Sequence, residues 1–266
     1  MSNKTESMTS LPKELEKIAE DFTWKNCTMG YSGTKVFKLT KNQNILYLKI
    51  GSRNSVFNLK KEKIILEWIS DKLPVPEVLY FKKENSKEFL LLSEIKGKAI
   101  HIIKSNRERR NAISILAEGL KKIHTINPSY CPTNNNPDRL LELTRTRLRK
   151  GHVDSSKFDK RWSDKNPEQL FEGLLKLKPK EYDLVFSHGD YCLPNVLINN
   201  NQLSGIIDWP YGGVNDRYFD LAAVTWSISF NYGEEWVKYF FQDYGIDKID
   251  WDRIFFFQML NEFFQQ

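Results

Sequence analysis

Apolar and polar positions alternate along several short stretches of the first hundred residues. Within residues 34–49 the alternation predicts two strands joined by the polar turn Lys41–Asn44, and further strands are predicted at Val78–Phe81 and Phe89–Ser93. From Leu59 to Leu73 apolar residues recur at helical spacing, and prolines follow directly. The first part of the chain is therefore expected to be rich in antiparallel strands, with one helix.

Beyond Gly97 the apolar positions mostly follow the period of a helix. Helices are predicted at Arg109–Ile126, Arg139–Arg149, Pro167–Leu177, Tyr218–Phe230, Glu234–Tyr244 and Trp251–Phe264, and short strands at Val185–His188, Val196–Ile198 and Leu203–Asp208. A small β-rich lobe, residues 1–95, is thus expected to precede a larger, mainly helical lobe, residues 96–266. This pattern predicts an α+β protein of two lobes, in which residues 1–10 form a disordered lead.

The length of 266 residues is sufficient for two lobes that each have a core. No apolar run reaches the roughly 18 residues of a membrane span, and the first residues lack the apolar core of a secretory signal, so no membrane partner is expected. Cys27, Cys131 and Cys192 show no zinc-motif spacing and favour free thiols in a reducing cytoplasm. The net charge of +6 is scattered without a nucleic-acid-binding motif, so no nucleic acid partner is expected.

The segment that predicts chemistry is Ser187–Asn195, in which Asp190 follows a His-Gly pair and Asn195 comes five positions later. Phosphoryl transfer to a hydroxyl needs an aspartate that accepts or orients the proton of the attacking hydroxyl, and oxygen ligands for Mg²⁺. Asn195 offers one such ligand, and Asp208, at the end of the next apolar strand, offers another. Asp and Asn are also common turn residues, but three of them at this spacing favour the catalytic interpretation.

The first lobe contains residues suited to bind a nucleotide. The turn Gly30–Thr34 precedes a strand and is a candidate phosphate-covering loop, although such turns are common before hairpins. Lys49 ends the next strand and is a candidate ligand of the α- and β-phosphates, with Glu62 on the following helix as its partner. A Lys–Glu pair between strand and helix can equally be a surface salt bridge that contributes under about 1 kcal/mol.

From about Gly30 to Phe264 the chain resembles the aminoglycoside phosphotransferases, and especially the 3′-phosphotransferases (kanamycin kinases). The resemblance is carried by Val36–Leu39, Leu46–Lys49, Lys72–Pro76, Leu92–Glu94, Val185–Asp190, Ser204–Asp208, Gly212–Gly213, Asp216–Ala222, Tyr244–Ile246 and Leu260–Phe264. The His-Gly-Asp segment with Asn195 is shared by many small-molecule kinases, whereas the closing segment is more particular to the 3′-enzymes.

The resemblance implies the bilobal fold of protein kinases, ATP or GTP as phosphate donor and Mg²⁺ as cofactor. Asp190 would be the catalytic base, and Asn195 and Asp208 would hold the metal. The nucleotide would be bound by Ser32 in the phosphate-covering loop, Tyr47 on the adenine, Lys49 with Glu62 at the phosphates, and the Ser93 carbonyl and Ile95 amide at the hinge. The acceptor site would include Asp154, Asp159, Tyr211, Asn261, Glu262 and Phe264.

The acceptor side is where this sequence departs from the family pattern. Aminoglycosides are polycations, yet Asn261 stands where the family has an aspartate, and Tyr211 stands where a basic residue is usual. The loop 154–161 carries more basic than acidic residues, among them Lys157 and Arg161. If these side chains face the acceptor they weaken its binding. If they point to solvent they matter little, since an exposed pair contributes about 1 kcal/mol or less.

Three functions therefore stay open at the level of sequence. The first is an aminoglycoside 3′-phosphotransferase, which would confer antibiotic resistance. The second is a kinase for another hydroxylated metabolite, such as a sugar, an amino alcohol or a nucleoside, and the basic loop and Asn261 motivate it. The third is a nucleotide-binding pseudokinase, which the intact set of Lys49, Asp190, Asn195 and Asp208 argues against.

Overall fold

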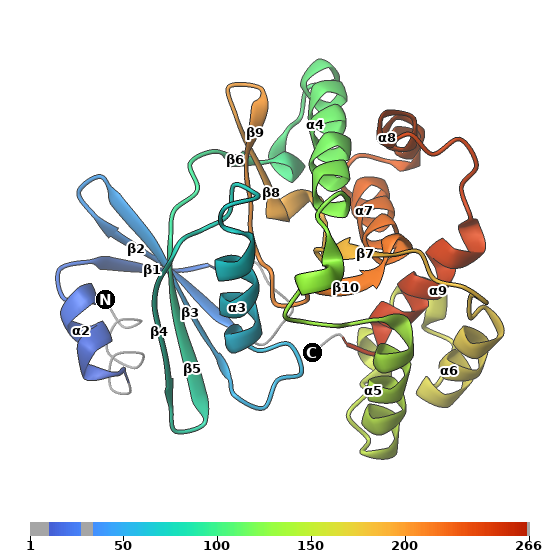
Figure 1. Ribbon diagram of the computed structural model, residues 1–266, viewed down its shortest axis with the longest axis horizontal. Coiled ribbons are helices and arrows are strands. Elements are labelled where there is room, and N and C mark those ends of the chain that lie inside the picture. The colour runs from blue at the N-terminus through green and yellow to red at the C-terminus, as the bar shows by residue number, and fades with distance from the viewer. Residues whose placement is uncertain (1–10, 28–33, 265–266) are drawn as a thin grey trace.

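A computed structural model describes residues 11–27 and 34–264, and its first part is a five-stranded antiparallel sheet (Figure 1). The strands are β1 (Thr23–Cys27), β2 (Lys35–Lys41), β3 (Asn44–Ser52), β4 (Val78–Glu84) and β5 (Lys87–Ser93), in the spatial order β1-β2-β3-β5-β4. Lys41 pairs with Asn44 at the closed end of the β2–β3 hairpin, where the polar turn was predicted. The predicted disordered lead, residues 1–10, lies outside the described residues.

The two faces of this sheet bury different cores, because successive side chains of a strand point to opposite sides. On β5, Phe89 belongs to the cluster that helix α2 (Lys13–Ala19) covers, whereas the neighbouring Leu90 belongs to the main core. Helix α3 (Leu59–Ile69) packs on that second face. Figure 1 shows α2 and α3 on opposite sides of the sheet. The second face thereby joins the sheet to the rest of the molecule.

The second part of the chain is mainly helical and carries two small sheets. Its helices are α4 (Asn106–His124), α5 (Pro137–Arg149), α6 (Pro167–Lys176), α7 (Arg217–Asn231), α8 (Val237–Tyr244) and α9 (Trp251–Glu262), and its strands are β6 (Lys98–Ala99), β7 (Leu184–Ser187), β8 (Val196–Asn199), β9 (Gln202–Ile206) and β10 (Gly213–Asp216). Single 3₁₀ turns lie at Ile100–Ile102, Pro128–Tyr130, Ser155–Lys157, Lys160–Trp162, Leu193–Asn195 and Glu234–Trp236. The strands form the sheets β6-β8-β9 and β7-β10. A β-rich part followed by a mainly helical part confirms the predicted α+β class.

Several predicted elements end earlier than expected, among them α3 and β9. Helix α3 stops at Ile69, before the predicted Leu73, where the Lys72 amide bonds the Ile69 carbonyl in a tighter turn and Pro74 disfavours a helical conformation at Leu73. Strand β9 stops at Ile206 rather than at Asp208, since the Ile206 amide donates to the Pro74 carbonyl and Asp208 has a φ of 69°, outside the range of a strand. The sequence pattern did not predict α2 and β1, which are short segments with mostly charged or polar residues.

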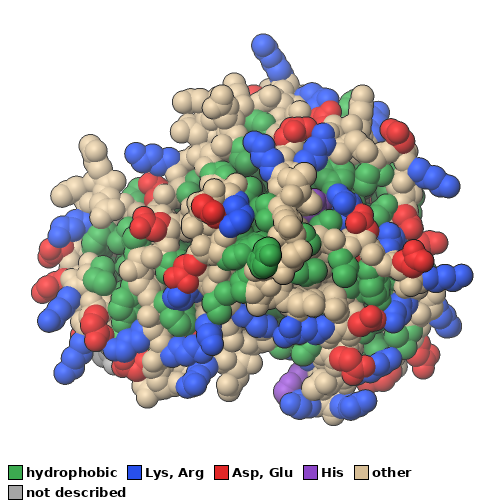
Figure 2. Space-filling model, viewed as in Figure 1, with side chains coloured by type: hydrophobic (Ala, Val, Ile, Leu, Met, Phe, Trp, Pro, Cys, Tyr) green, Lys and Arg blue, Asp and Glu red, His purple; other side chains and the backbone are tan. Residues whose placement is uncertain are grey.

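The surface carries its charge in a dispersed form. Lysine and arginine side chains are spread over the face seen in Figure 2, with acidic side chains among them. This distribution agrees with the scattered positive residues of the sequence. Among the helices that the structure describes, none is both long and apolar enough to cross a membrane.

Helix α4 packs against the loop that follows β7, and one glycine allows the close approach. Tyr191 is fully buried there, and its hydroxyl donates to the Leu116 carbonyl of α4 at 2.9 Å. A Cβ atom added to Gly119, further along α4, would lie 2.5 Å from that hydroxyl. Because the Tyr191 ring is enclosed by a close-packed core, it has little room to give way.

Gly119→Ala should therefore destabilise the protein by about 1–3 kcal/mol, although alanine is the better helix former by about 1 kcal/mol. The matched control is Gly173→Ala in α6, where the new methyl group meets only the flexible end of Met259, at 3.1 Å. This control should be neutral or stabilising. Urea unfolding of both variants measures the difference, and equal effects would contradict the role given to Tyr191.

Candidate active site

The loop between β7 and β8 carries the predicted catalytic residues, and a buried carboxylate holds its start. The backbone amides of His188 and Gly189 donate to the two oxygens of Asp220, at 2.9 and 2.7 Å. Asp220 lies in the first turn of α7 and is completely buried. Gly189 has a φ of 86°, and a Cβ atom there would come within 2.5 Å of Tyr211, so this turn requires glycine.

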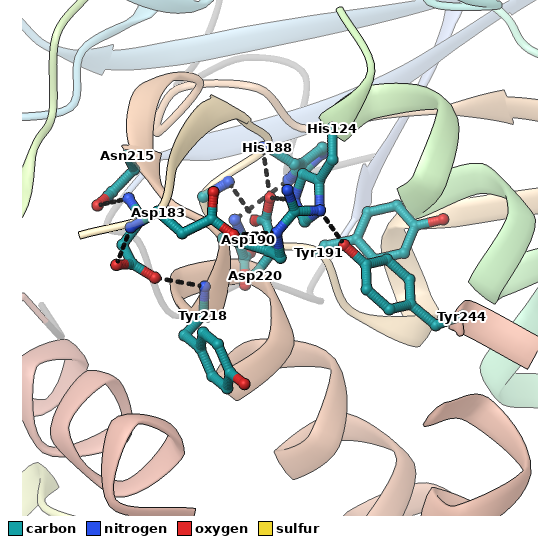
Figure 3. Close-up of polar contacts among 12 residues, drawn as sticks. His124, Asp183, His188, Asp190, Tyr191, Asn215, Tyr218, Asp220 and Tyr244 are labelled. Atoms are coloured by element: carbon teal, nitrogen blue, oxygen red, sulfur yellow. Dashed lines mark hydrogen bonds and ion pairs between the residues drawn. The ribbon is translucent and has the colours of Figure 1, made fainter. Parts of the chain in front are cut away.

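Asp220 is held from its other side by a buried histidine (Figure 3). His124 of α4 contacts Asp220 through Nε2 at 3.0 Å and the Tyr244 hydroxyl through Nδ1 at 2.6 Å. Burial by itself raises the pKa of Asp220, but the bond from His124 and the amide of Gly189 hold it below its usual value. The carboxylate therefore stays charged and keeps accepting these hydrogen bonds.

His188 supports the loop as a neutral ring. Its Nε2 donates to the Ile207 carbonyl at 3.0 Å, and its Nδ1 accepts from the Asp190 amide at 3.1 Å. A ring with one donating and one accepting nitrogen is uncharged, in agreement with the lowered pKa that burial gives His188. The ring thus ties Asp190 to the segment that leads to Asp208.

Asp190 and Asn195 are in direct contact. The Asn195 amide nitrogen donates to the Asp190 carbonyl at 3.0 Å and to its carboxylate at 3.1 Å, which leaves the amide oxygen of Asn195 for another ligand. Burial, followed by the negative charge of Asp208, raises the pKa of Asp190 to about 7. A carboxylate with this pKa is a better proton acceptor at neutral pH than an ordinary aspartate.

Lys49 joins the two lobes. Its ammonium lies 2.6 Å from Glu62 of α3 and 2.6 Å from Asp208. Burial lowers the pKa of Lys49, but the two carboxylates outweigh burial and raise it, so the lysine is charged. Burial raises the pKa of Asp208, and the lysine reverses this effect to leave it below its usual value. Because Glu62 is completely buried, the pair is not the surface salt bridge that the sequence also allowed.

Oxygen donors beside Asp190 fit the predicted magnesium site. They are the amide oxygen of Asn195 and the carboxylate of Asp208, of the hard type that Mg²⁺ prefers. Asp208 has a φ of 69°, an uncommon backbone conformation that is enriched at functional sites. Within residues 11–27 and 34–264 no group of three or more His, Cys, Asp or Glu side chains could hold a metal ion.

The other predicted nucleotide residues lie on β3 and beyond the end of β5. Tyr47 is partly buried, packs against the main core, and shares a face of β3 with Lys49, two residues further on. Ser93 is the last residue of β5, and Ile95 follows where the chain passes to the second lobe. Ser32 lies outside the described residues.

The acidic acceptor residues meet around the loop that follows α5. The Asp159 amide donates to Glu262 at 2.8 Å, and the Asp159 carboxylate accepts from Arg161 at 3.0 Å and from the Trp226 indole at 3.0 Å. Burial raises the pKa of Asp159, but these donors bring it down to about 2, whereas burial raises the pKa of Glu262 to about 7. Asp154 caps a turn within the loop and is exposed.

The remaining acceptor residues lie near the end of α9. Phe264 contacts Phe57, which in turn lies against Tyr211, with ring centres 5.5 and 4.1 Å apart. Phe57 comes from the first lobe, so this aromatic contact bridges the lobes. Asn261 is half-buried in the last turn of α9.

Sequence reasoning missed several residues of this site. His124 and Asp220 hold the catalytic loop, Trp226 holds Asp159, and Phe57 reaches the acceptor side. Asp220 could have been found from the sequence, because it is an acidic residue within the matching segment Asp216–Ala222, in the first turn of a predicted helix. His124 and Trp226 bond to partners 96 and 67 residues away in the chain, which no local pattern shows.

A β-rich lobe with a buried Lys–Glu pair and a helical lobe with two aspartates and an asparagine define a kinase-like phosphotransferase with a hydroxyl group as acceptor. The model of the phosphotransferase enzyme family matches residues 23–257, and the chain belongs to this family. The aminoglycoside 3′-phosphotransferases of Niallia circulans and Enterococcus faecalis are 33% and 34% identical to it, over 97% and 94% of this chain and 99% and 97% of their own lengths.

Solved structures share the fold. An aminoglycoside-3′-phosphotransferase of type VIII has a TM-score of 0.85 at 24% identity and covers 95% of this chain and 97% of its own. The aminoglycoside phosphotransferase APH(3″)-Id from Streptomyces rimosus has a TM-score of 0.85 at 24% identity, over 100% of both chains. These structures confirm the predicted kinase-like fold.

Lys49→Met should destabilise the protein by about 3 kcal/mol near pH 8, because it leaves Glu62 buried with an unbalanced charge. Burial raises the pKa of Glu62, so the carboxyl takes up a proton more readily as the pH falls from 8 to 5, and the loss should shrink. Lys63→Met is the matched control, since its pair with Glu67 is largely exposed and contributes about 0.5 kcal/mol or less. Urea unfolding at both pH values measures the effect, and a pH-independent loss would argue against the buried charge.

Proposed function

We propose that the chain transfers the γ-phosphoryl group of ATP or GTP to the 3′-hydroxyl of an aminoglycoside antibiotic. The contact of Asp190 with Asn195, beside the Lys49–Asp208 pair, carries the phosphoryl-transfer part, because a base, metal ligands and a phosphate ligand then share one site. The names of the full-length relatives support an aminoglycoside as acceptor.

Each polar residue of the site has a separate task in this proposal. Asp190 accepts the proton of the attacking hydroxyl, and its raised pKa favours that step. Lys49 binds the nucleotide phosphates, and Glu62 keeps the lysine in place. Asn195 and Asp208 hold Mg²⁺, which neutralises charge on the phosphates when it is bound. Tyr47, Ser93 and Ile95 contact the adenine, and Ser32 contacts the phosphates.

Nucleotide binding is assigned to the lobe of residues 1–95 and acceptor binding to the lobe of residues 96–266. Related phosphotransferases have been solved with ADP and streptomycin, and with GDP and kanamycin, which supports both donor nucleotides and this class of acceptor. The three cysteines are unpaired, in support of a reducing cytoplasm as the place of action.

A kinase for another hydroxylated metabolite is the second candidate, and the acceptor side motivates it. Arg161 already pairs with Asp159, and Asn261 carries no charge. Glu262, with a pKa of about 7, is partly protonated at neutral pH. A polycation would therefore meet fewer full negative charges. At about 1 kcal/mol for each lost pair, two such losses weaken binding by more than about tenfold.

A phosphotransfer assay with purified protein, Mg²⁺ and ATP or GTP separates the two candidates. Kanamycin and neomycin are offered beside a panel of sugars, amino alcohols and nucleosides, and mass spectrometry with NMR locates the new phosphate. Kanamycin phosphorylated at its 3′-position is the expected product. Turnover of a metabolite alone would establish the second candidate instead. Arg161→Ala should lower the KM for kanamycin, since it frees the Asp159 charge.

The raised pKa of Asp190 makes the transfer depend on pH. Below about pH 7 the carboxyl is increasingly protonated and cannot take up another proton, so kcat should fall roughly tenfold per pH unit and level off above about pH 7. Asp190→Ala should lower kcat by at least about a hundredfold, lose this inflection and leave nucleotide affinity nearly unchanged. A wild-type profile that is flat between about pH 5 and 8 would show that another group is the base.

A further inference from the structure

A cavity of about 620 Å³ lies where the last residues of α4 and α8 meet the first residues of α7 and α9. Its lining contains none of the residues assigned to the nucleotide or the acceptor. The volume is in the range of sites for small molecules. Four side chains of the lining are basic and one is acidic: Lys121, Arg217, Lys248 and Arg253 against Asp183.

The two arginines of the wall have donors that their present partners do not use. Arg217 donates through Nε to Asp183 at 2.6 Å and through Nη1 to the Tyr244 hydroxyl at 2.9 Å. Arg253 donates through Nη2 to the Glu181 carbonyl and to the Asp216 carboxylate, the latter at 3.2 Å. Within the described residues, Nη2 of Arg217 and Nη1 of Arg253 donate no hydrogen bond. Guanidinium groups with spare donors are suited to bind the oxygens of a phosphate.

The lysines add charge to the same wall. Lys121 pairs with Glu118, whose carboxylate is more than half exposed. Lys248 is exposed and has no ion pair in the part of the chain that the structure describes. The first turns of α7 and α9 carry positive partial charge, and the last turns of α4 and α8 carry negative partial charge. These helix ends roughly oppose each other, so the side-chain cations decide that the cavity favours an anion.

The wall of this cavity is connected to the catalytic loop by a continuous row of hydrogen bonds, of which Figure 3 labels Tyr244, His124 and Asp220. Arg217 donates to the Tyr244 hydroxyl at 2.9 Å, which contacts His124 at 2.6 Å. His124 contacts Asp220 at 3.0 Å, and Asp220 accepts a hydrogen bond from the Gly189 amide at 2.7 Å. The three middle residues are buried, so water cannot readily replace a bond that weakens there.

We propose that this cavity binds a small phosphate-bearing anion, and that its occupancy slows phosphoryl transfer through Arg217 and Tyr244. An anion that attracts the Arg217 guanidinium weakens its bond to the Tyr244 hydroxyl. The restraint on His124 and Asp220 then weakens, and with it the position of the loop residue before Asp190. The binding site stands on the geometry of the cavity, and the kinetic effect rests on Asp190 as part of the reaction centre.

Calorimetry with inorganic phosphate tests the site. The nucleotide site is first filled with a non-hydrolysable ATP analogue and Mg²⁺, so that the γ-phosphate position is also occupied and phosphate cannot bind there. The protein should bind phosphate at millimolar concentration, and Lys248→Ala should weaken this binding by about fivefold. Lys176→Ala, which removes an exposed lysine of α6, should leave it unchanged. Absence of phosphate binding, or equal behaviour of the two variants, would overturn the site.

Kinetics with Tyr244→Phe test the connection. At constant ionic strength, phosphate should lower the wild-type kcat and leave the nucleotide KM unchanged. Tyr244→Phe should still bind phosphate in the calorimeter, yet its kcat should not respond. Arg217→Lys keeps the charge but cannot reach both Asp183 and Tyr244, so its kcat should also not respond to phosphate. It is the substitute variant if Tyr244→Phe folds poorly. A wild-type kcat that ignores bound phosphate, a raised nucleotide KM, or a variant that responds like wild type would overturn the connection.

Discussion

The buried carboxylate of Asp220 is the contact on which the reaction centre depends. It accepts hydrogen bonds from the backbone amides of His188 and Gly189 and contacts His124, and it is completely buried from water. A charge in such a place is tolerated only when donors satisfy it, because burial without them costs several kcal/mol. Those donors come from α4 and from the catalytic loop, while the carboxylate itself belongs to α7. The position of Asp190 is therefore set by helix packing in the second lobe.

Lys49 performs a comparable task between the lobes. Glu62 and Asp208 both contact its ammonium, while Asp190 has no ion pair among the described residues. Burial raises the pKa of Asp208, but Lys49 holds it below its usual value, whereas burial, followed by the negative charge of Asp208, raises the pKa of Asp190 to about 7. Neighbouring carboxylates with pKa values pushed apart are suited to different roles, which in the proposed reaction are those of a metal ligand and a proton acceptor. One cation thus contributes both to the contact between the lobes and to the low pKa of Asp208.

The acceptor side follows the opposite principle, because its charges are already partly satisfied within the protein. Asp159 is occupied by Arg161 and Trp226, and Glu262 accepts the Asp159 amide. These contacts order the loop after α5, and they reduce the negative charge that is left for a polycation. The order of this loop and its attraction for a charged acceptor therefore compete for the same carboxylates. Membership of the family concerns the fold and the reaction. It is therefore consistent with a site that favours loop order and with one that favours a charged acceptor.

The sequence by itself determined the α+β class, most helices and strands, the family, and the set of residues that the proposed reaction uses. These follow from local periodicity and from short motifs, because burying one face of a helix or strand and building a phosphoryl-transfer loop both constrain neighbouring residues. Only the tertiary structure decided that Lys49–Glu62 is buried, that the Trp226 indole donates to Asp159, and that Arg217, Tyr244 and His124 lead to Asp220. The bond between His124 and Tyr244 spans 120 residues of chain. Such contacts depend on how whole helices pack, and no local pattern of residues encodes that packing.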